Sequence, residues 1–203
     1  MKKLFLIGCM VAAAYRGAGQ IKVGPEAGLN ISNYSFSHPQ RAYTSSPMPG
    51  VRLGVVADLA LLGDRCYLQP GVMYVGNGAT VNEPGYTIST RQSFRVHTIE
   101  VPFNLLYKFG NADRSRFFVG AGLYLGMNIS DEVFYISNYD MGAGLNAGFE
   151  SGGGLFVRVT SQWGVLRPKP SDISVGSSNY ALTLGYFFKR NRTSGKLLED
   201  SIN

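Results

Sequence analysis

The sequence lacks the features that define several classes of protein. No apolar run reaches the ~18 residues that a membrane-spanning helix needs, which excludes a multi-spanning helical membrane protein. Charged residues are only 16% of the 203 residues, well below the roughly 25% of an ordinary soluble domain. There are two cysteines and two histidines, so neither a disulfide scaffold nor a Cys/His metal cluster is expected.

The residues that are abundant narrow the fold class further. Hydrophobic residues make up 45% of the chain, with 26 glycines, 12 phenylalanines and 12 tyrosines. So many aromatic residues exclude a disordered chain, and the glycines have no three-residue period, which excludes collagen. The length suits one domain. The composition therefore favours a single β-rich domain in a solvent other than water.

The first twenty residues have the pattern of a targeting segment. Lys2 and Lys3 precede an apolar stretch at residues 4–15, and small residues precede Gln20. This pattern predicts a signal peptide at residues 1–19. The segment 6–9 also resembles a lipoprotein box, but cleavage before Cys9 would leave too short an apolar core. Cleavage after Gly19 lowers the formal charge from +6 to +3, which does not favour nucleic-acid binding, and leaves Cys66 as a single thiol.

From residue 20 onward, apolar residues alternate with polar or small ones, which is the signature of β-strands with two different faces. The pattern is clearest at residues 117–130, where Phe117, Val119 and Ala121 alternate with Phe118, Gly120 and Gly122. Eight such segments occur, at residues 20–32, 51–61, 66–76, 97–109, 117–130, 140–150, 155–163 and 180–188. They predict an all-β fold, an eight-stranded antiparallel up-and-down transmembrane β-barrel over residues 20–189, with a polar tail at 190–203.

The two faces of these segments differ in chemistry. One face has no charged residue, whereas the other is rich in glycine and carries nearly balanced charges. Alternation alone does not say which face is inside, and a soluble lipocalin-like barrel would turn the apolar face inward. The small, glycine-rich face suits a narrow lumen and the bulky uncharged face suits lipid. We therefore predict a lumen closed by a charge network of Lys22, Glu26, Arg52, Asp58, Glu100, Lys108, Glu150 and Arg158, with Asp140 on the same face.

Loop lengths and aromatic positions support a membrane barrel. Long connections at residues 33–50, 77–96, 131–139 and 164–179 alternate with short ones at 62–65, 110–116 and 151–154, as in outer-membrane barrels with short periplasmic turns. Both termini are then periplasmic. We expect β-bulges or displaced strand ends at Pro25, Pro70 and Pro102. The predicted aromatic girdles are Tyr107, Phe109, Phe117, Phe149, Tyr186 and Phe188 near the short turns, and Tyr74, Trp163 and Tyr180 at the opposite ends.

Four stretches resemble a known family. They are residues 22–30, residues 67–74 with Tyr-Leu-Gln-Pro, residues 99–108 with Ile-Glu-Val-Pro, and residues 184–188 with Leu-Gly-Tyr-Phe-Phe. Their order and spacing over residues 20–189 resemble the small PorT-like outer-membrane β-barrel family of Bacteroidetes. The resemblance implies an eight-stranded barrel in the outer membrane of a Gram-negative bacterium. Some members of this family take part in secretion or gliding machinery, and the resemblance brings no catalytic residues.

The search for chemistry favours a protein that is not an enzyme. No nucleophile elbow, zinc motif or phosphate loop is present, so we predict no catalytic residue, metal or cofactor. The expected partners are the bilayer and lipopolysaccharide, the outer-membrane insertion machinery, and a protein bound at the long loops. Aromatic and arginine residues that suit such contacts are Tyr34, Phe36, His38, Arg41, Tyr43, Tyr86, Arg91, Phe94 and Arg95. Two alternatives remain: an enzyme acting on lipid or peptide through His38 or His97, and a narrow, porin-like channel.

Overall fold

The computed structural model describes residues 21–38, 41–42, 44–83, 90–111, 114–130, 139–166 and 174–188. The signal peptide expected at residues 1–19 and the polar tail expected at residues 190–203 lie outside the described residues. In the part of the chain that is described, no helix is long and apolar enough to cross a bilayer.

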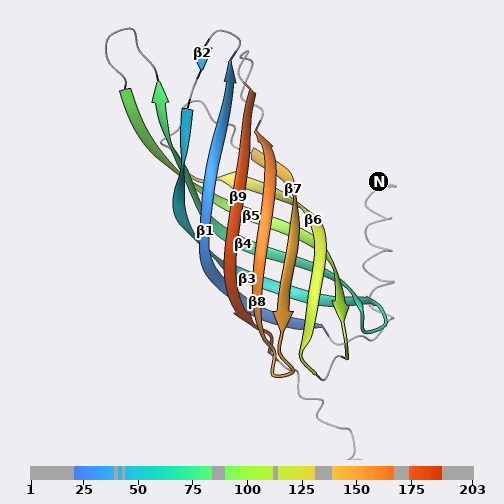
Figure 1. The fold of residues 1–203 in the computed structure, drawn as a ribbon. Helices are drawn as coiled ribbons and strands as arrows, with labels where there is room; N and C mark the ends of the chain where they lie inside the picture. Colours follow the sequence, from blue (N-terminus) through green and yellow to red (C-terminus); the bar gives the residue numbers. More distant parts are fainter. Residues whose placement is uncertain are drawn as a thin grey trace, which may run out of the picture.

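All the strands belong to one antiparallel sheet (Figure 1). They are β1 (Lys22–His38), β2 (Arg41–Ala42), β3 (Thr44–Leu62), β4 (Cys66–Glu83), β5 (Thr90–Phe109), β6 (Arg116–Asn128), β7 (Tyr139–Glu150), β8 (Leu155–Leu166) and β9 (Ser174–Tyr186). Each long strand pairs with the next one, and β1 also pairs with β9, so the sheet closes. The two-residue β2 only extends the hairpin beyond β1. The predicted eight-stranded barrel is confirmed.

The direction of the side chains settles which face is inside. Along β6, Phe118 and Tyr124 are buried, whereas Phe117 and Leu123 are 65% and 67% exposed. The same alternation repeats on the other long strands, and almost all of their large exposed side chains are apolar. An apolar outer surface is stable against lipid but not against water. The lipocalin-like arrangement, with its apolar face inward, is therefore excluded.

The barrel has two unlike ends. Residues 63–65, 110–115 and 151–154 connect strands at one end, here called the short-turn end, where β1 begins and β9 finishes (Figure 1). The connections at the opposite end, here called the long-loop end, lie mostly outside the described residues. Gly63 and Gly154 have φ values of +58° and +99° in the short turns. Glycine adopts such conformations without the steric cost that a Cβ would bring, so these residues allow the chain to reverse tightly.

The strands at the long-loop end extend further than the sequence pattern predicts. The β4–β5 ladder continues to the pair Glu83 and Thr90, whereas the β5–β6 ladder stops at Thr98 and Asn128. Much of the predicted loops at residues 33–50 and 77–96 is therefore strand. One wall of the barrel, formed by β1, β3, β4 and β5, rises above β6 and β7 (Figure 1). A ladder in water needs no apolar face, so alternation does not mark these extensions.

The sequence predicts a β-bulge or a displaced strand end at each of three prolines, but all three lie inside strands without a register shift, so that prediction is wrong. Pro25 pairs with Val55 in an unbroken β1–β3 register, and Pro102 pairs with Tyr124 in β5–β6. Between β4 and β5, the pairing is interrupted after Pro70 for two residues and resumes at Met73 without a change of offset. The register shifts between β3 and β4 lie elsewhere, at residues 47–52 and 60–62. A missing N–H thus opens the ladder locally and leaves its register unchanged.

Glycines on the inward face make room for large rings. Gly148 lies opposite Phe118 in the β6–β7 ladder, and Gly142 lies opposite Tyr124. A Cβ added at Gly148 would lie 2.4 Å from Cζ of Phe118, and one at Gly142 would lie 2.6 Å from Cε1 of Tyr124. Each ring therefore occupies the space that a side chain on the neighbouring strand would need. This packing fills the lumen, and it explains why the polar face is rich in glycine.

Candidate functional site

The interior of the barrel holds equal numbers of positive and negative side chains among the described residues. Nine of these ten charged residues are buried, and Lys22 is partly buried. The cations are Lys22, Arg52, Lys108, Arg116 and Arg158, and the anions are Glu26, Asp58, Glu100, Asp140 and Glu150. Buried charges are costly unless they are paired and hydrogen-bonded. Their pairing is therefore the main feature of the site.

At the short-turn end, the Glu150 carboxylate is the centre of a cluster. Nζ of Lys22 lies 3.2 Å from its Oε1, and Nζ of Lys108 lies 2.7 Å from its Oε2. Arg116, opposite Glu150 in the β6–β7 ladder, contacts both carboxylate oxygens at 3.1–3.2 Å. Arg116 also donates to the hydroxyl of Tyr67 at 3.1 Å. Three cations from β1, β5 and β6 thus meet one carboxylate of β7.

A chain of polar contacts continues from this cluster across the lumen. Lys108 also binds the fully buried carboxylate of Asp58, which accepts a 2.8 Å hydrogen bond from Nε2 of Gln69. The side-chain oxygen of Gln69 accepts from Arg158. Arg158 in turn lies 3.2 Å from Oε2 of Glu26. The contacts therefore link β5, β3, β4, β8 and β1, which lie on different sides of the barrel.

Aromatic rings surround the cations of this chain. Nζ of Lys108 lies 4.4 Å from the ring centre of Tyr67 and 5.3 Å from that of Phe187. The guanidinium of Arg158 lies 5.3 Å from the ring centre of Phe156, which stacks on Phe187 with centres 4.6 Å apart. Rings at such distances attract cations and exclude water. They therefore stabilise the positive charges and fill the space around them.

A second ion pair lies nearer the long-loop end. Nη2 of Arg52 is 2.7 Å from Oε1 of Glu100, and Nη1 is 3.3 Å from Oε2. Gln162 bridges the pair, because it accepts from Arg52 at 3.0 Å and donates to Glu100 at 2.7 Å. All three side chains are buried. This arrangement holds β3, β5 and β8 together across the lumen.

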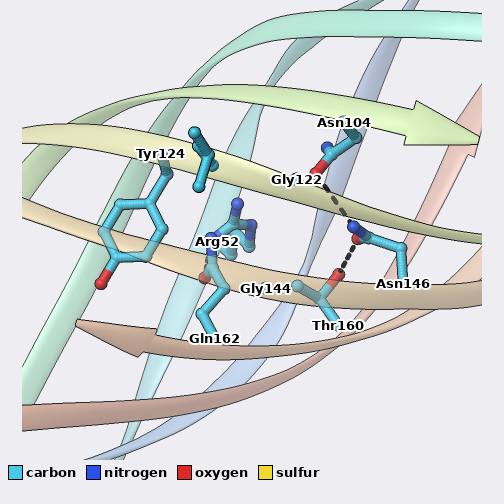
Figure 2. Close-up of a pocket in the computed structure, with 9 residues that line it drawn as sticks. Arg52, Asn104, Gly122, Tyr124, Gly144, Asn146, Thr160 and Gln162 are labelled. Atoms are coloured by element: carbon cyan, nitrogen blue, oxygen red, sulfur yellow. Dashed lines mark hydrogen bonds between the residues drawn. The ribbon is translucent and has the colours of Figure 1, made fainter.

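A small cavity lies beside this ion pair (Figure 2). Asn146 donates to Oδ1 of Asn104 at 2.9 Å and accepts from Thr160 at 3.0 Å, so three strands supply a hydrogen-bonded row on one side of it. Arg52 and Gln162 line the other side. The cavity holds about 10 Å³, which is room for about one water molecule.

The structure brings together the residues that the sequence assigned to the lumen. Lys22, Lys108, Asp58, Glu150, Arg158 and Glu26 belong to the connected chain, and Arg52 with Glu100 forms the separate pair. Sequence reasoning missed Arg116 because it placed this residue in a turn. The available signal was its position two residues before the inward Phe118, since residues two apart share a face.

The residues of the predicted girdles point outward. Phe117 and Phe149 have ring centres 5.1 Å apart, and Tyr186 and Phe188 have centres 5.7 Å apart. The exposed aromatic residues of the prediction are Tyr107, Phe109, Phe117, Phe149, Trp163, Tyr180, Tyr186 and Phe188. Tyr74 is only partly exposed, because its hydroxyl lies 2.6 Å from Nδ1 of His97 and the two rings stack.

The residues that the sequence analysis assigned to partner contacts or catalysis do not share one environment in the structure. Tyr34 is buried in the barrel and packs on Phe94 with ring centres 5.5 Å apart, which corrects its assignment to an exposed loop. Arg95 is exposed. His38 ends β1, opposite Arg41. Tyr43 and Tyr86 lie outside the described residues. Within the described ranges, no group of three or more His, Cys, Asp or Glu side chains is arranged to hold a metal ion.

Residues 14–142 match the sequence family described as "Outer membrane protein beta-barrel domain". The chain belongs to this family. The match spans more than half of the chain, so the protein is a transmembrane β-barrel of the outer membrane and lies in its lipid bilayer. No curated protein matches the sequence significantly.

Solved structures support the fold. The outer membrane protein OprG from Pseudomonas aeruginosa is 13% identical, with 83% of this chain and 96% of OprG covered and a TM-score of 0.56. The outer membrane enzyme PagL is 16% identical, with 77% and 98% covered and a TM-score of 0.47. Neisserial surface protein A is 12% identical, with 84% and 100% covered and a TM-score of 0.48. At such low identity these matches concern the fold alone, and only the OprG match is strong enough to carry that argument.

Proposed function

We propose that this outer-membrane protein is a closed barrel with a plugged, salt-bridged lumen, and that it acts as a structural or interaction protein through its long-loop end. The ion-pair chain from Glu150 to Glu26 carries the first part of the proposal, because it crosses the lumen at the short-turn end. The Arg52–Glu100 pair closes the lumen at a second level, nearer the long-loop end. The cavity between these levels holds about one water molecule.

Conductance tests the plug directly. The purified protein is reconstituted into planar bilayers, with a conducting porin inserted under the same conditions as the control. We expect no stable conductance steps from the wild type. The double variant Phe118→Ala/Phe156→Ala, which removes two rings from the plug, should admit ions if it folds. Regular conductance steps from the wild type would contradict the proposal and support the narrow-channel alternative.

The taller wall of β1, β3, β4 and β5 supports an interaction role for the long-loop end. This wall projects beyond β6 and β7, and it exposes Arg95 two residues from the outward-facing Tyr74–His97 pair. Arginine beside aromatic residues suits both lipopolysaccharide phosphates and a protein partner. A photo-crosslinking residue at position 95, with position 115 at the short-turn end as control, should capture lipopolysaccharide or protein only from position 95. Equal capture at both positions would contradict the proposal.

The proposal also covers the orientation of the barrel in the membrane and the subtype of the family to which it belongs. We propose that residues 1–19 are a signal peptide, that both termini and the short turns are periplasmic, and that the insertion machinery assembles the barrel. The PorT-like subtype is supported by the resemblance of residues 22–30, 67–74, 99–108 and 184–188. Mass spectrometry should show Gln20 as the first residue. A protease site added at the C-terminus should be protected from external protease in intact cells. Cleavage at this site would show that the C-terminus is outside the cell and would contradict the proposed orientation.

The enzyme alternative is tested by the same purified protein. Lipid hydrolysis, acyl transfer or peptide cleavage that His97→Ala or His38→Ala abolishes would replace the proposed role. Nδ1 of His97 is engaged by the hydroxyl of Tyr74, and its backbone N–H donates to the hydroxyl of Ser130 at 3.3 Å. We expect no such activity above the rate of a protein-free control.

A further inference from the structure

A second cavity, here called the outer chamber, lies in the lumen toward the long-loop end. Its described lining consists of hydroxyl, amide and carboxyl side chains, and it includes no lysine, arginine or histidine. The chamber holds about 10 Å³, enough for one water-sized occupant. It contacts two carboxylates, Glu100 and Asp140. Glu100 is neutralised by Arg52, which leaves Asp140 to be explained.

Asp140 is a buried carboxylate without a cationic partner among the described residues. Only 7% of its surface is exposed, and none of the ion pairs formed by the described side chains includes it. Its Oδ2 accepts a 3.3 Å hydrogen bond from the hydroxyl of Tyr124. Its Oδ1 is buried and lies near Oγ of Ser177, but no described residue donates a well-aligned hydrogen bond to it. A buried charge in this state needs a further ligand or a proton.

Other oxygens converge on the same place. A Cβ built on Gly164 would lie 2.2 Å from the hydroxyl oxygen of Tyr124, 2.4 Å from Oγ of Ser177 and 2.7 Å from Oδ1 of Asp140. Three side-chain oxygens from β6, β9 and β7 therefore meet over one glycine of β8. Asn179 also lines the chamber and is 8% exposed, and no described residue donates a hydrogen bond to its buried Oδ1.

We propose that the outer chamber binds one small, hard monovalent cation, of the class of Na⁺, with Asp140 as the charged ligand and Tyr124, Ser177 and Asn179 supplying neutral oxygens. Hard cations prefer such oxygen ligands. A single positive charge neutralises the one unpaired carboxylate, whereas a divalent ion would leave an excess charge in a dry interior. The site is independent of the proposed plug, because it holds whether or not the barrel conducts.

The test is the effect of Na⁺ on unfolding at constant ionic strength. Choline chloride is replaced stepwise by NaCl at neutral pH, and the urea midpoint of the detergent-solubilised barrel is measured. For the wild type, the unfolding equilibrium constant should fall about tenfold for each tenfold rise in Na⁺ above its dissociation constant. Asp140→Asn should lose this dependence. Asp64→Asn, the same change at an exposed short-turn residue, should retain it.

Further measurements keep the outcome decisive. If Asp140→Asn fails to fold, Ser177→Ala serves as the second variant. It removes one neutral ligand and should weaken the dependence of the urea midpoint on Na⁺. The wild-type protein should broaden the ²³Na NMR line, and the Ser177→Ala variant should broaden it less. The proposal is overturned if the wild type responds equally to NaCl and choline chloride, if Asp140→Asn keeps the full Na⁺ dependence, or if Ca²⁺ stabilises at far lower concentration than Na⁺.

Discussion

The ring of Phe156 lies over the backbone of Gly185, its partner in the β8–β9 ladder. A Cβ at position 185 would be 2.1 Å from Cζ of Phe156 and 2.6 Å from Cε1. The ring is almost fully buried and stacks on Phe187. It therefore cannot swing away without disturbing the aromatic packing around Arg158. The absence of a side chain at Gly185 thus leaves the space that the aromatic packing of the lumen needs.

Gly185→Ala tests this packing. The added methyl group must displace the Phe156 ring, and overpacking of this kind lowers the free energy of unfolding by about 1–3 kcal/mol. Gly176→Ala is the control, because nothing lies within 4 Å of the added Cβ at this position of the same strand. Urea unfolding of both variants in detergent measures the difference. Equal stability of the two variants would show that the ring does not depend on Gly185.

Arg116, which sequence reasoning missed, should be as important as the predicted lumen cations. Arg116→Ala should lower the free energy of unfolding by about 3 kcal/mol. This is the lower end of the range for breaking a buried pair, because Lys22 and Lys108 still contact Glu150. Arg114→Ala, at an exposed residue of the same turn, should have almost no effect. Comparable losses from both changes would contradict the cluster around Glu150.

The ion pair of Glu26 and Arg158 should be strongly coupled. Arg158→Met keeps much of the side-chain volume but leaves the Glu26 carboxylate buried and unpaired, at a cost of about 3–5 kcal/mol. Glu26→Gln in the same chain removes that charge, so the double variant should be more stable than Arg158→Met alone. A double-mutant cycle from unfolding midpoints measures the coupling. Additive effects would show that the two charges do not depend on each other.

A charge on the outer face should be far more costly than one at a turn. Leu123 is 67% exposed in the middle of β6, so Leu123→Arg places a cation in lipid and should cost about 2–4 kcal/mol. Ser115→Arg, in the short turn before β6, should be nearly neutral. Folding yield into lipid vesicles and urea midpoints measure both. Tolerance of arginine at both positions would argue against a lipid-facing surface.

The closed ladder should make the protein heat-modifiable. The β1–β9 pairing leaves no open sheet edge in the membrane span, so an unboiled sample should remain folded in dodecyl sulfate and migrate differently from a boiled one. A chain that ends at residue 166 lacks β9 and cannot close, so it should migrate identically with and without boiling. Identical migration of the full-length samples would contradict a closed barrel.

The sequence by itself determined the strand pattern and the composition of both faces. A period of two follows from strand geometry alone, so the eight alternating segments, the charge-free face of Leu123 and the charged face of Lys108 were all predictable. The short turns were predictable as well, because they interrupt the alternation sharply. Outside the bilayer the pattern no longer has to alternate, which is why the extensions of β4 and β5 could not be predicted.

Only the tertiary structure decided which groups meet. Closing the sheet brings Lys22 of β1 to Glu150 of β7, residues that are 128 apart in sequence, and no local rule specifies such a contact. The structure also decided that the prolines leave the register unchanged and that Asp140 has no cationic partner among the described residues. These outcomes depend on barrel closure, because it fixes distances across the lumen that periodicity along one strand does not contain.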